Sequence, residues 1–161
     1  MGIRATLKGA VLVGLMATMG AGAAMAQACT ETEFSSKTGQ TYLEAEQAAM
    51  VKKDFNTAIA KLNSLRSTEL NCYEEGAVIK LSAYIKIENG DRAGAVQDLL
   101  TALNKGYIPA ADAAQTYYNI AQIYLQEEDL GKALDYMTKW QQAGGKPDRT
   151  QKWQLAVLNQ R

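Results

Sequence analysis

Three stretches of the sequence share one pattern: DFNTAIAKL (residues 54–62), DRAGAVQDL (91–99) and DLGKALDYM (129–137). Each stretch begins with Asp, carries Ala at its fifth position and ends on an apolar residue at its ninth. Small and apolar residues that recur three and four positions apart form the buried face of a helix. Because the copies lie 37 and 38 residues apart, the sequence predicts an array of similar helical units.

The repeat extends beyond these stretches and predicts two helices in each unit. Pro109 and Pro147 are 38 residues apart, and the same interval separates Ala83 from Ala121. A second helical run precedes each Asp, and the Asp residues mark turns because Asp is a favoured helix N-cap. First helices are predicted over residues 38–52, 74–88 and 111–127, second helices over 55–66, 92–104 and 131–142, and a closing helix over 148–159. The fold class is therefore predicted to be all-α.

The two ends of the array differ from its middle. In the first unit the 37-residue interval places Glu46 where the other units have a small residue, so the register of the first helix stays open by one residue. Such departures are expected in a terminal repeat, one face of which meets water. The closing helix is predicted to bury Trp153, Ala156, Val157 or Leu158 against the third unit.

The third unit is the best preserved. In it Tyr117-x-x-Ile120-Ala121-x-x-Tyr124 is followed by Ala133, Met137, Trp140 and Pro147. In this order of aromatic, small and proline residues the chain resembles the tetratricopeptide repeat (TPR) family. The resemblance implies an α-solenoid of three TPR-like helix-turn-helix units with a C-terminal closing helix, over residues 38–160. It also implies that first helices line a concave surface, where an extended peptide or a partner helix binds.

The same resemblance indicates candidate binding residues on the first helices, outside the packing pattern. These candidates are Lys80, Tyr84, Glu88, Gln115, Tyr118, Asn119 and Gln122. Side-chain amides both donate and accept hydrogen bonds and tyrosine adds contact area, so a surface of this composition suits a peptide backbone. The alternative is that these are ordinary exposed helix residues, and that Tyr84 or Tyr118 packs against a neighbouring helix.

The N-terminus is predicted to be a cleaved signal peptide that directs the chain to the periplasm. Arg4 and Lys8 precede the apolar residues 9–23, and small residues follow that allow cleavage after Ala26 or Ala28. A permanent transmembrane helix is the alternative. Four glycines and several alanines make the apolar stretch less hydrophobic than a typical membrane-spanning helix, and a polar chain follows it.

Cleavage changes the charge of the chain. Removal of residues 1–26 leaves an N-terminal segment at 27–37 ahead of the helical domain, and 15 basic against 17 acidic residues, a net charge of −2. Nucleic acids and anionic lipids attract clustered Lys and Arg, so neither is expected as a partner. No membrane span is expected after cleavage.

The chain has two cysteines, Cys29 and Cys72. An even pair in an exported protein predicts a disulfide. Cys72 stands where the other units have proline, and Cys29 precedes the first unit, so the bond is expected to pin residues 30–36 over the exposed end of the array. The alternative is that Cys29 is acylated as a lipoprotein cysteine. The residues before it, Ala26 and Gln27, fit poorly with the usual acylation sequence.

Catalysis is not expected. The 161-residue chain has no His, which excludes Ser-His-Asp and Cys-His nucleophilic sites and His-ligated metals. It has no Gly-rich loop with Walker or Rossmann spacing, and its acidic run at 127–129 lies at a helix junction. No enzyme activity, no cofactor and no metal site is therefore predicted.

The predicted function is a non-catalytic protein-interaction module of the bacterial periplasm, with a protein or peptide of the cell envelope as its partner. The last third, with Lys132-Ala133-Leu134 and Lys146-Pro147-Asp148, is also similar to periplasmic TPR proteins associated with TonB-ExbB-ExbD systems. A small-molecule or lipid binding protein with a helical groove is the alternative. A homo-oligomer joined through Tyr and Trp residues near the ends of the array also stays open.

Overall fold

The structure is a computed structural model that describes residues 29–160. The predicted signal peptide at 1–26 and its cleavage sites lie outside the described residues. The described part consists of helices and contains no strand, which confirms the all-α prediction. The helices are α1 (Gly39–Glu46), the π-helix η1 (Gln47–Val51), α2 (Phe55–Arg66), α3 (Cys72–Glu88), α4 (Arg92–Asn104), α5 (Ala110–Gln126), α6 (Leu130–Gln142) and α7 (Arg149–Leu158).

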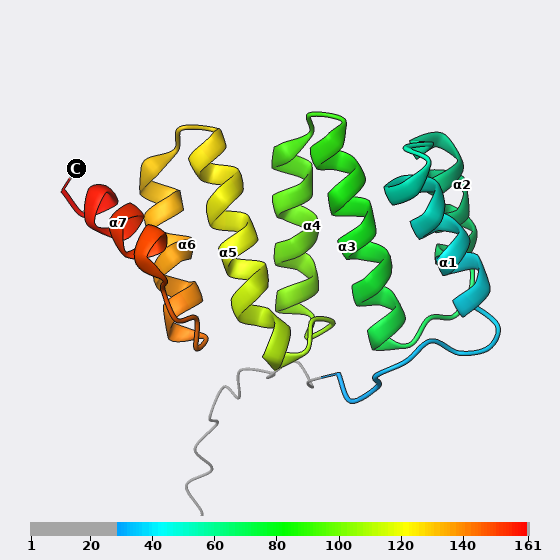
Figure 1. Cartoon of the computed structure of the whole chain (residues 1–161). Coiled ribbons are helices and arrows are strands. Elements are labelled where there is room, and N and C mark those ends of the chain that lie inside the picture. Colours follow the sequence, from blue (N-terminus) through cyan, green and yellow to red (C-terminus); the bar gives the residue numbers. More distant parts are fainter. Residues whose placement is uncertain (1–28, 161) are drawn as a thin grey trace, which may run out of the picture.

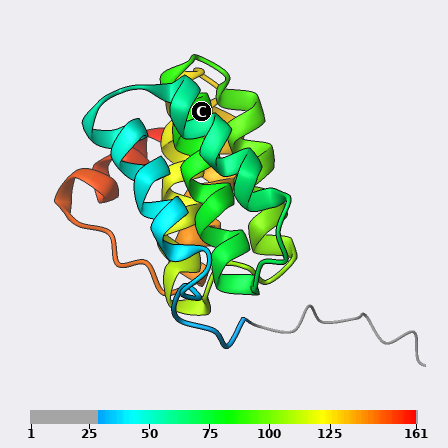
Figure 2. The same ribbon diagram turned by 90° about the vertical axis from the view of Figure 1, so that its right-hand side faces the viewer.

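The helices stand side by side in one row, and neighbours along the chain run in opposite directions (Figure 1). The closest packing joins α1 to α2, α3 to α4 and α5 to α6, so the row is made of three helix pairs followed by α7. In both Figure 1 and the view from the end in Figure 2, α1 and α7 lie toward the same side of the row. This arrangement makes a face to which the first helices α1, α3 and α5 contribute together with α7.

The repeated residues have the same role in each pair. Each repeat Asp is the N-cap of the second helix, and its carboxylate accepts a hydrogen bond of 2.9–3.1 Å from the backbone N–H three residues later. The caps are Asp54, Asp91 and Asp129. The alanine four positions after each Asp is fully buried, at Ala58, Ala95 and Ala133. The sequence repeat therefore reflects one cap and one close helix contact, used three times.

The first pair accommodates one extra residue. Residues 38–52 were predicted as one α-helix, but its last part is the π-helix η1. Ala45 is fully buried whereas Glu46 is partly exposed. Ala45 lies nine positions before Asp54, the N-cap of α2, whereas Ala83 lies eight positions before Asp91, the N-cap of α4. A π-helical turn holds one more residue than an α-helical turn, so η1 takes up the extra residue between Ala45 and Asp54. Ala45 is therefore the counterpart of Ala83, one residue away from the position that the 37-residue interval gives.

The closing helix packs through one of the four residues that were predicted as alternatives for burial. Leu158 is 6% exposed and packs against Met137 and Trp140, so it is the one of the four that meets the third pair, whereas Trp153 is 67% exposed. The two residues lie five positions apart, which places them about 140° apart around the helix. Because α7 packs against helices on one side only, it buries just one of these two faces.

The N-terminal segment lies along the edge of the row where α3 begins (Figure 1). The Sγ atoms of Cys29 and Cys72 are 2.05 Å apart, a distance compatible with the predicted disulfide. The Cys29 N–H donates to the carbonyl of Gly106, at 3.2 Å, and the Ser35 N–H donates to the carboxylate of Glu74, at 2.8 Å. The segment thus crosses below α3 and reaches the turn before α5. Its expected position over the exposed end of the array is wrong, because its bonding partners lie further along the row.

Among residues 29–160 no helix combines the length and the apolar character that a membrane crossing requires.

Gly76 marks a close approach between α3 and the turn before α5. A Cβ atom at this position would lie 2.2 Å from the carbonyl oxygen of Tyr107. Because that neighbour is backbone, the turn must move. We expect Gly76→Ala to lower the free energy of unfolding by about 1–3 kcal/mol despite the better helix propensity of Ala. Urea unfolding measures it.

Gly131→Ala is the matched control for Gly76→Ala. The added Cβ would have only the Asp129 carboxylate near it, at 3.9 Å, so this change in α6 should be neutral or stabilising. Equal or greater stability of Gly76→Ala compared with the wild type would contradict the close approach.

Candidate functional site

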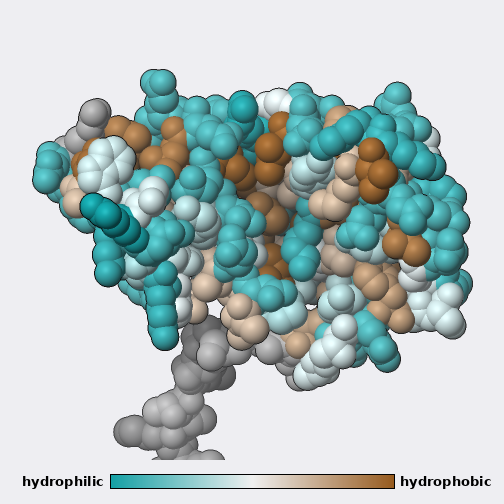
Figure 3. All heavy atoms as spheres, in the orientation of Figure 1, coloured by the Kyte–Doolittle hydropathy of each residue, from teal (hydrophilic) through white to brown (hydrophobic). Residues whose placement is uncertain are grey.

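A groove of about 310 Å³ lies between α3 and α5. We call it the α3–α5 groove. Its floor is apolar and its rim is polar. The floor consists of Ala83, Ile87, Leu99 and Ile123, and the rim of Lys80, Tyr84, Thr116, Asn119, Gln122 and Gln126. Figure 3, which looks onto this face, shows a hydrophobic band between α3 and α5 with hydrophilic side chains on both sides. Such a groove offers apolar contact below and hydrogen bonds above.

The floor is part of the core that joins the second and third helix pairs. Ala83 is 1% exposed, and Ile123 and Leu99 are 5% and 6% exposed. Leu99 comes from α4, which stands behind α3 and α5. Because α3 has a small alanine here, α4 reaches the bottom of the groove. The floor is therefore built by packing that the fold itself requires.

Two contacts order the rim near the start of α5. The ammonium of Lys80 lies 4.0 Å from the carboxylate of Asp112, which links α3 with α5. Gln115 donates to the side-chain oxygen of Asn119, at 2.9 Å, one helical turn away. Lys80 and Asn119 are exposed, so both are accessible to a ligand that lies along the groove.

Lys53 joins the site from the turn before α2. It adopts the left-handed backbone conformation (φ 55°), and its ammonium donates to the Tyr84 hydroxyl and, at 3.3 Å, to the Glu88 carboxylate. The hydrogen bond to Tyr84 raises the pKa of Lys53; burial lowers it, and Glu88 raises it further. Lys53 was not predictable as a site residue, because its contacts span more than 30 positions of the sequence. A Tyr hydroxyl that accepts one bond still has a proton to donate.

Four of the seven predicted residues line the α3–α5 groove: Lys80, Tyr84, Asn119 and Gln122. Glu88 and Gln115 do not line the groove. Glu88 accepts a hydrogen bond from Lys53, and Gln115 donates one to Asn119. Tyr118 is placed elsewhere, because its ring packs on Trp140 of α6 with the ring centres 5.2 Å apart. Consecutive helix positions differ by about 100°, which turns Tyr118 toward α6 while Asn119 remains exposed.

A second hollow of about 370 Å³ adjoins the first, between α5 and α7. We call it the α5–α7 pocket. It is lined by Gln122, Leu125, Gln126, Leu130, Trp153, Gln154, Val157 and Leu158. Gln122 and Gln126 line both hollows, so the two form one continuous surface across α3, α5 and α7. This part of the surface was not predicted from the sequence, in which Trp153 was one of four alternative residues for burial by the closing helix.

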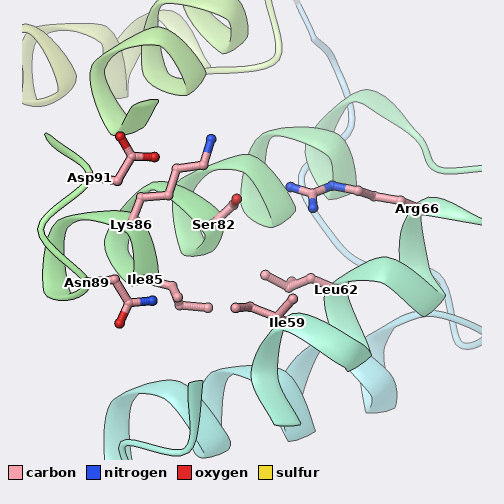
Figure 4. A pocket seen from close by; sticks show the side chains of 8 residues that line it. All are labelled: Ile59, Leu62, Arg66, Ser82, Ile85, Lys86, Asn89 and Asp91. Atoms are coloured by element: carbon pink, nitrogen blue, oxygen red, sulfur yellow. The ribbon is translucent and has the colours of Figure 1, made fainter. Parts of the chain in front are cut away.

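A third hollow, of about 280 Å³, lies between α2 and α3 beside the turn into α4 (Figure 4). Ile59 and Leu62 point toward Ile85 at its apolar end. At the other end the Lys86 ammonium is paired with Asp98, at 2.8 Å, and Asp98 also accepts from Ser82, at 3.3 Å. Lys86 and Ser82 thus already serve the packing of α3 on α4, and this hollow is a weaker candidate.

One group of potential metal ligands converges within residues 29–160: Cys29, Glu31 and Cys72. The Glu31 carboxylate lies 2.7 Å from the Cys72 sulfur. Metal ions bind thiolates, and two sulfurs joined to each other have no thiolate to offer. With the sulfurs at bonding distance, this group does not form a metal centre.

The continuous surface formed by the groove and the pocket is therefore the candidate functional site. It has apolar floors and amide-rich edges, and two lysines lie at the α3 side of the groove: Lys80 in its rim and Lys53 beside Tyr84. Comparison with known proteins finds no match among protein-family models, curated proteins or solved structures.

Proposed function

We propose that this chain is an exported, TPR-like α-solenoid of three helix pairs with a closing helix, and that it acts as a non-catalytic protein-interaction module of the periplasm. Its ligand is an extended peptide or a partner helix that lies in the α3–α5 groove. The observation that carries the proposal is the groove itself, in which Lys80, Tyr84 and Asn119 stand over an apolar floor.

The chemistry of the groove suits a peptide. Side-chain amides pair with backbone C=O and N–H groups alike, and tyrosine adds apolar area with a hydroxyl at its end. The floor accepts apolar side chains, as in other grooves that hold peptides. The helices that form the groove are held by the core, so the free protein already has the binding shape, which reduces the entropic cost of binding.

A small-molecule or lipid ligand is less well supported. Small-molecule sites enclose most of the ligand and have volumes of roughly 300–1,000 Å³. The α3–α5 groove lies at the bottom of this range, with about 310 Å³. It is open to solvent along its length and would not enclose a small ligand.

Peptide selection tests the proposed function. Random 12-residue peptides displayed on their mRNA are selected on residues 27–161, and synthetic copies are measured by fluorescence anisotropy. We expect Lys80→Ala/Asn119→Ala to weaken binding about tenfold, because each lost hydrogen bond costs about 0.5–1.5 kcal/mol. Both residues are exposed, so the helical circular dichroism and melting temperature should stay unchanged.

Gln97→Ala on α4 is the control, since Gln97 is exposed and does not line the groove. Its affinity for the selected peptides should equal that of the wild type. The proposal fails when no peptide is enriched, or when the enriched peptides bind the double variant as tightly as the wild type.

A further inference from the structure

The α5–α7 pocket contains two buried amide atoms that have no hydrogen-bond partner among residues 29–160. They are Gln122 Nε2, a donor on α5, and Gln154 Oε1, an acceptor on α7. Buried polar atoms are nearly always paired, because an unpaired atom has lost its hydration without compensation. A ligand that brings one acceptor and one donor into this pocket removes both deficits.

The rest of the pocket is apolar. Besides three glutamines, its lining consists of Leu, Val and Trp side chains, and none of the described residues that line it is charged. Trp153 is 67% exposed, although it has the largest side chain in the lining. Exposed tryptophan beside aliphatic residues is typical of binding surfaces, where burial of the ring gives much of the affinity. The pocket therefore suits a ligand with an apolar body and a single neutral amide edge.

We propose that the α5–α7 pocket binds one apolar residue of an extended peptide, with the side chain of that residue against Trp153 and its backbone paired with Gln122 and Gln154. This inference rests on the proposed function, since the peptide enters from the α3–α5 groove. The two hollows share Gln122 and Gln126, so one chain can follow both without leaving the surface.

The geometry of an extended chain matches the two amides. One residue of a β-strand directs its own N–H and C=O to the same side, and in antiparallel pairs it uses both toward a single partner. In the pocket, the C=O accepts from Gln122 and the N–H donates to Gln154. The terminal torsion of a glutamine has broad minima, so a small rotation turns each amide toward the bound backbone.

The other occupants differ from a peptide in what they offer to these atoms. A lipid acyl chain has no donor for Gln154. A second copy of this chain would bury Trp153 without any added ligand. The two glutamine side chains would also be satisfied if Gln122 Nε2 donated a hydrogen bond to Gln154 Oε1, and the pocket would then need no ligand.

The test follows the fluorescence of Trp153 with the selected peptides on residues 27–161. The other tryptophan, Trp140, is 6% exposed and contributes a constant background; Trp153→Phe identifies the source of any change. We expect the peptides to shift the emission to shorter wavelength. Replacing their one essential apolar residue with Ala should weaken binding at least tenfold and abolish the shift.

Backbone recognition is tested at Gln154. We expect Gln154→Leu to weaken binding about fivefold, and N-methylation of the matching peptide N–H to do the same. The two changes together should cost no more than either alone, because they remove the same hydrogen bond. Gln141→Leu on the exposed surface of α6 is the matched control and should leave the affinity unchanged.

The probe N-acetyl-leucine methylamide, at millimolar concentration, tests the pocket without the groove. A shift of the Trp153 emission with this probe supports the pocket even when peptide selection fails. If the selected peptides bind through Lys80 and Asn119 without a shift of the Trp153 emission, the proposal for the α5–α7 pocket is wrong and the proposed function stands.

Three results identify a different occupant and overturn the proposal. The first is a shift with decanoate but none with the leucine probe, which assigns the pocket to a lipid chain. The second is a shift that appears on raising the protein concentration alone, which assigns it to a second copy. The third is strong non-additivity of Gln122→Leu and Gln154→Leu in unfolding of the free protein, which shows that the two amides pair with each other.

Discussion

The double variant Cys29→Ala/Cys72→Ala is expected to unfold with a free energy about 4 kcal/mol lower than that of the wild type. The two cysteines are 43 positions apart, and a cross-link over a loop of this length removes that much entropy from the unfolded chain. For a domain of this size the loss corresponds to a melting temperature lower by about 10–15 °C. Thermal unfolding followed by circular dichroism measures it.

Reduced wild-type protein is the natural control for this variant. In the presence of a phosphine reductant its melting temperature should match that of the double variant, whereas the double variant itself should not respond to the reductant. Mass analysis of unreduced, alkylated protein from its own host should find no free thiol and no acyl chain on Cys29. Two free thiols, or a stability loss below about 1 kcal/mol, would contradict a structural disulfide.

Glu74→Gln is expected to have the second-largest effect, a loss of about 2–3 kcal/mol at pH 7. The Glu74 side chain is 2% exposed and accepts hydrogen bonds from the Ser35 and Asn71 N–H groups, at 2.8 and 2.9 Å, and from the Thr38 hydroxyl. Bonds to a carboxylate are worth about 1.5–3 kcal/mol. A Gln side chain turns an N–H donor toward these donors, so part of the network is left unpaired. Urea unfolding at pH 7 measures the loss.

The effect of Glu74 should depend on pH. Burial raises the pKa of Glu74, but the hydrogen bonds from Thr38, Ser35 and Asn71 outweigh burial and hold the pKa below its usual 4.5. A carboxyl with a lowered pKa in the folded state stabilises the fold above its unfolded pKa, and this stabilisation is lost as the pH falls. The difference between wild type and Glu74→Gln should therefore be full at neutral pH and shrink below about pH 4.5.

Glu75→Gln is the matched control, since it removes a charge one position further along the same helical turn. Its effect should stay within about 0.5 kcal/mol at pH 7. A Glu74→Gln variant as stable as Glu75→Gln would show that the carboxylate does not hold the N-terminal segment. Because the disulfide and Glu74 restrain the same segment, removing both should cost less than the sum of the single losses.

Much of the fold was predictable because local rules decide it. The Asp caps, the buried alanines and the helix periodicity act within a few residues of one another, and α2 and α4 match their predicted bounds. The other helices differ from prediction by one or two residues at most at each end, apart from the first, which is divided into α1 and η1. The π-helix was not predictable, because it forms where the burial of Ala45 against the neighbouring helices leaves one extra residue before the turn.

The candidate site was predictable in part. Lys80, Tyr84, Asn119 and Gln122 were selected because they lie outside the packing pattern, and all four line the α3–α5 groove. Tyr118 was not separable from them by sequence, since whether a tyrosine faces a neighbouring helix depends on the angle at which α6 crosses α5.

The sequence by itself determined the helical pairs, their caps and the absence of histidine chemistry, since these depend on residue type and on spacing within a turn or two. The tertiary structure alone decided how Lys53 reaches Tyr84, where the N-terminal segment runs, and that Trp153 faces the α5–α7 pocket. These features join residues that are far apart in sequence, and they follow from how whole helices pack. Periodicity fixes which side chains share a helix face, but only packing decides which faces meet one another and which are left for a ligand.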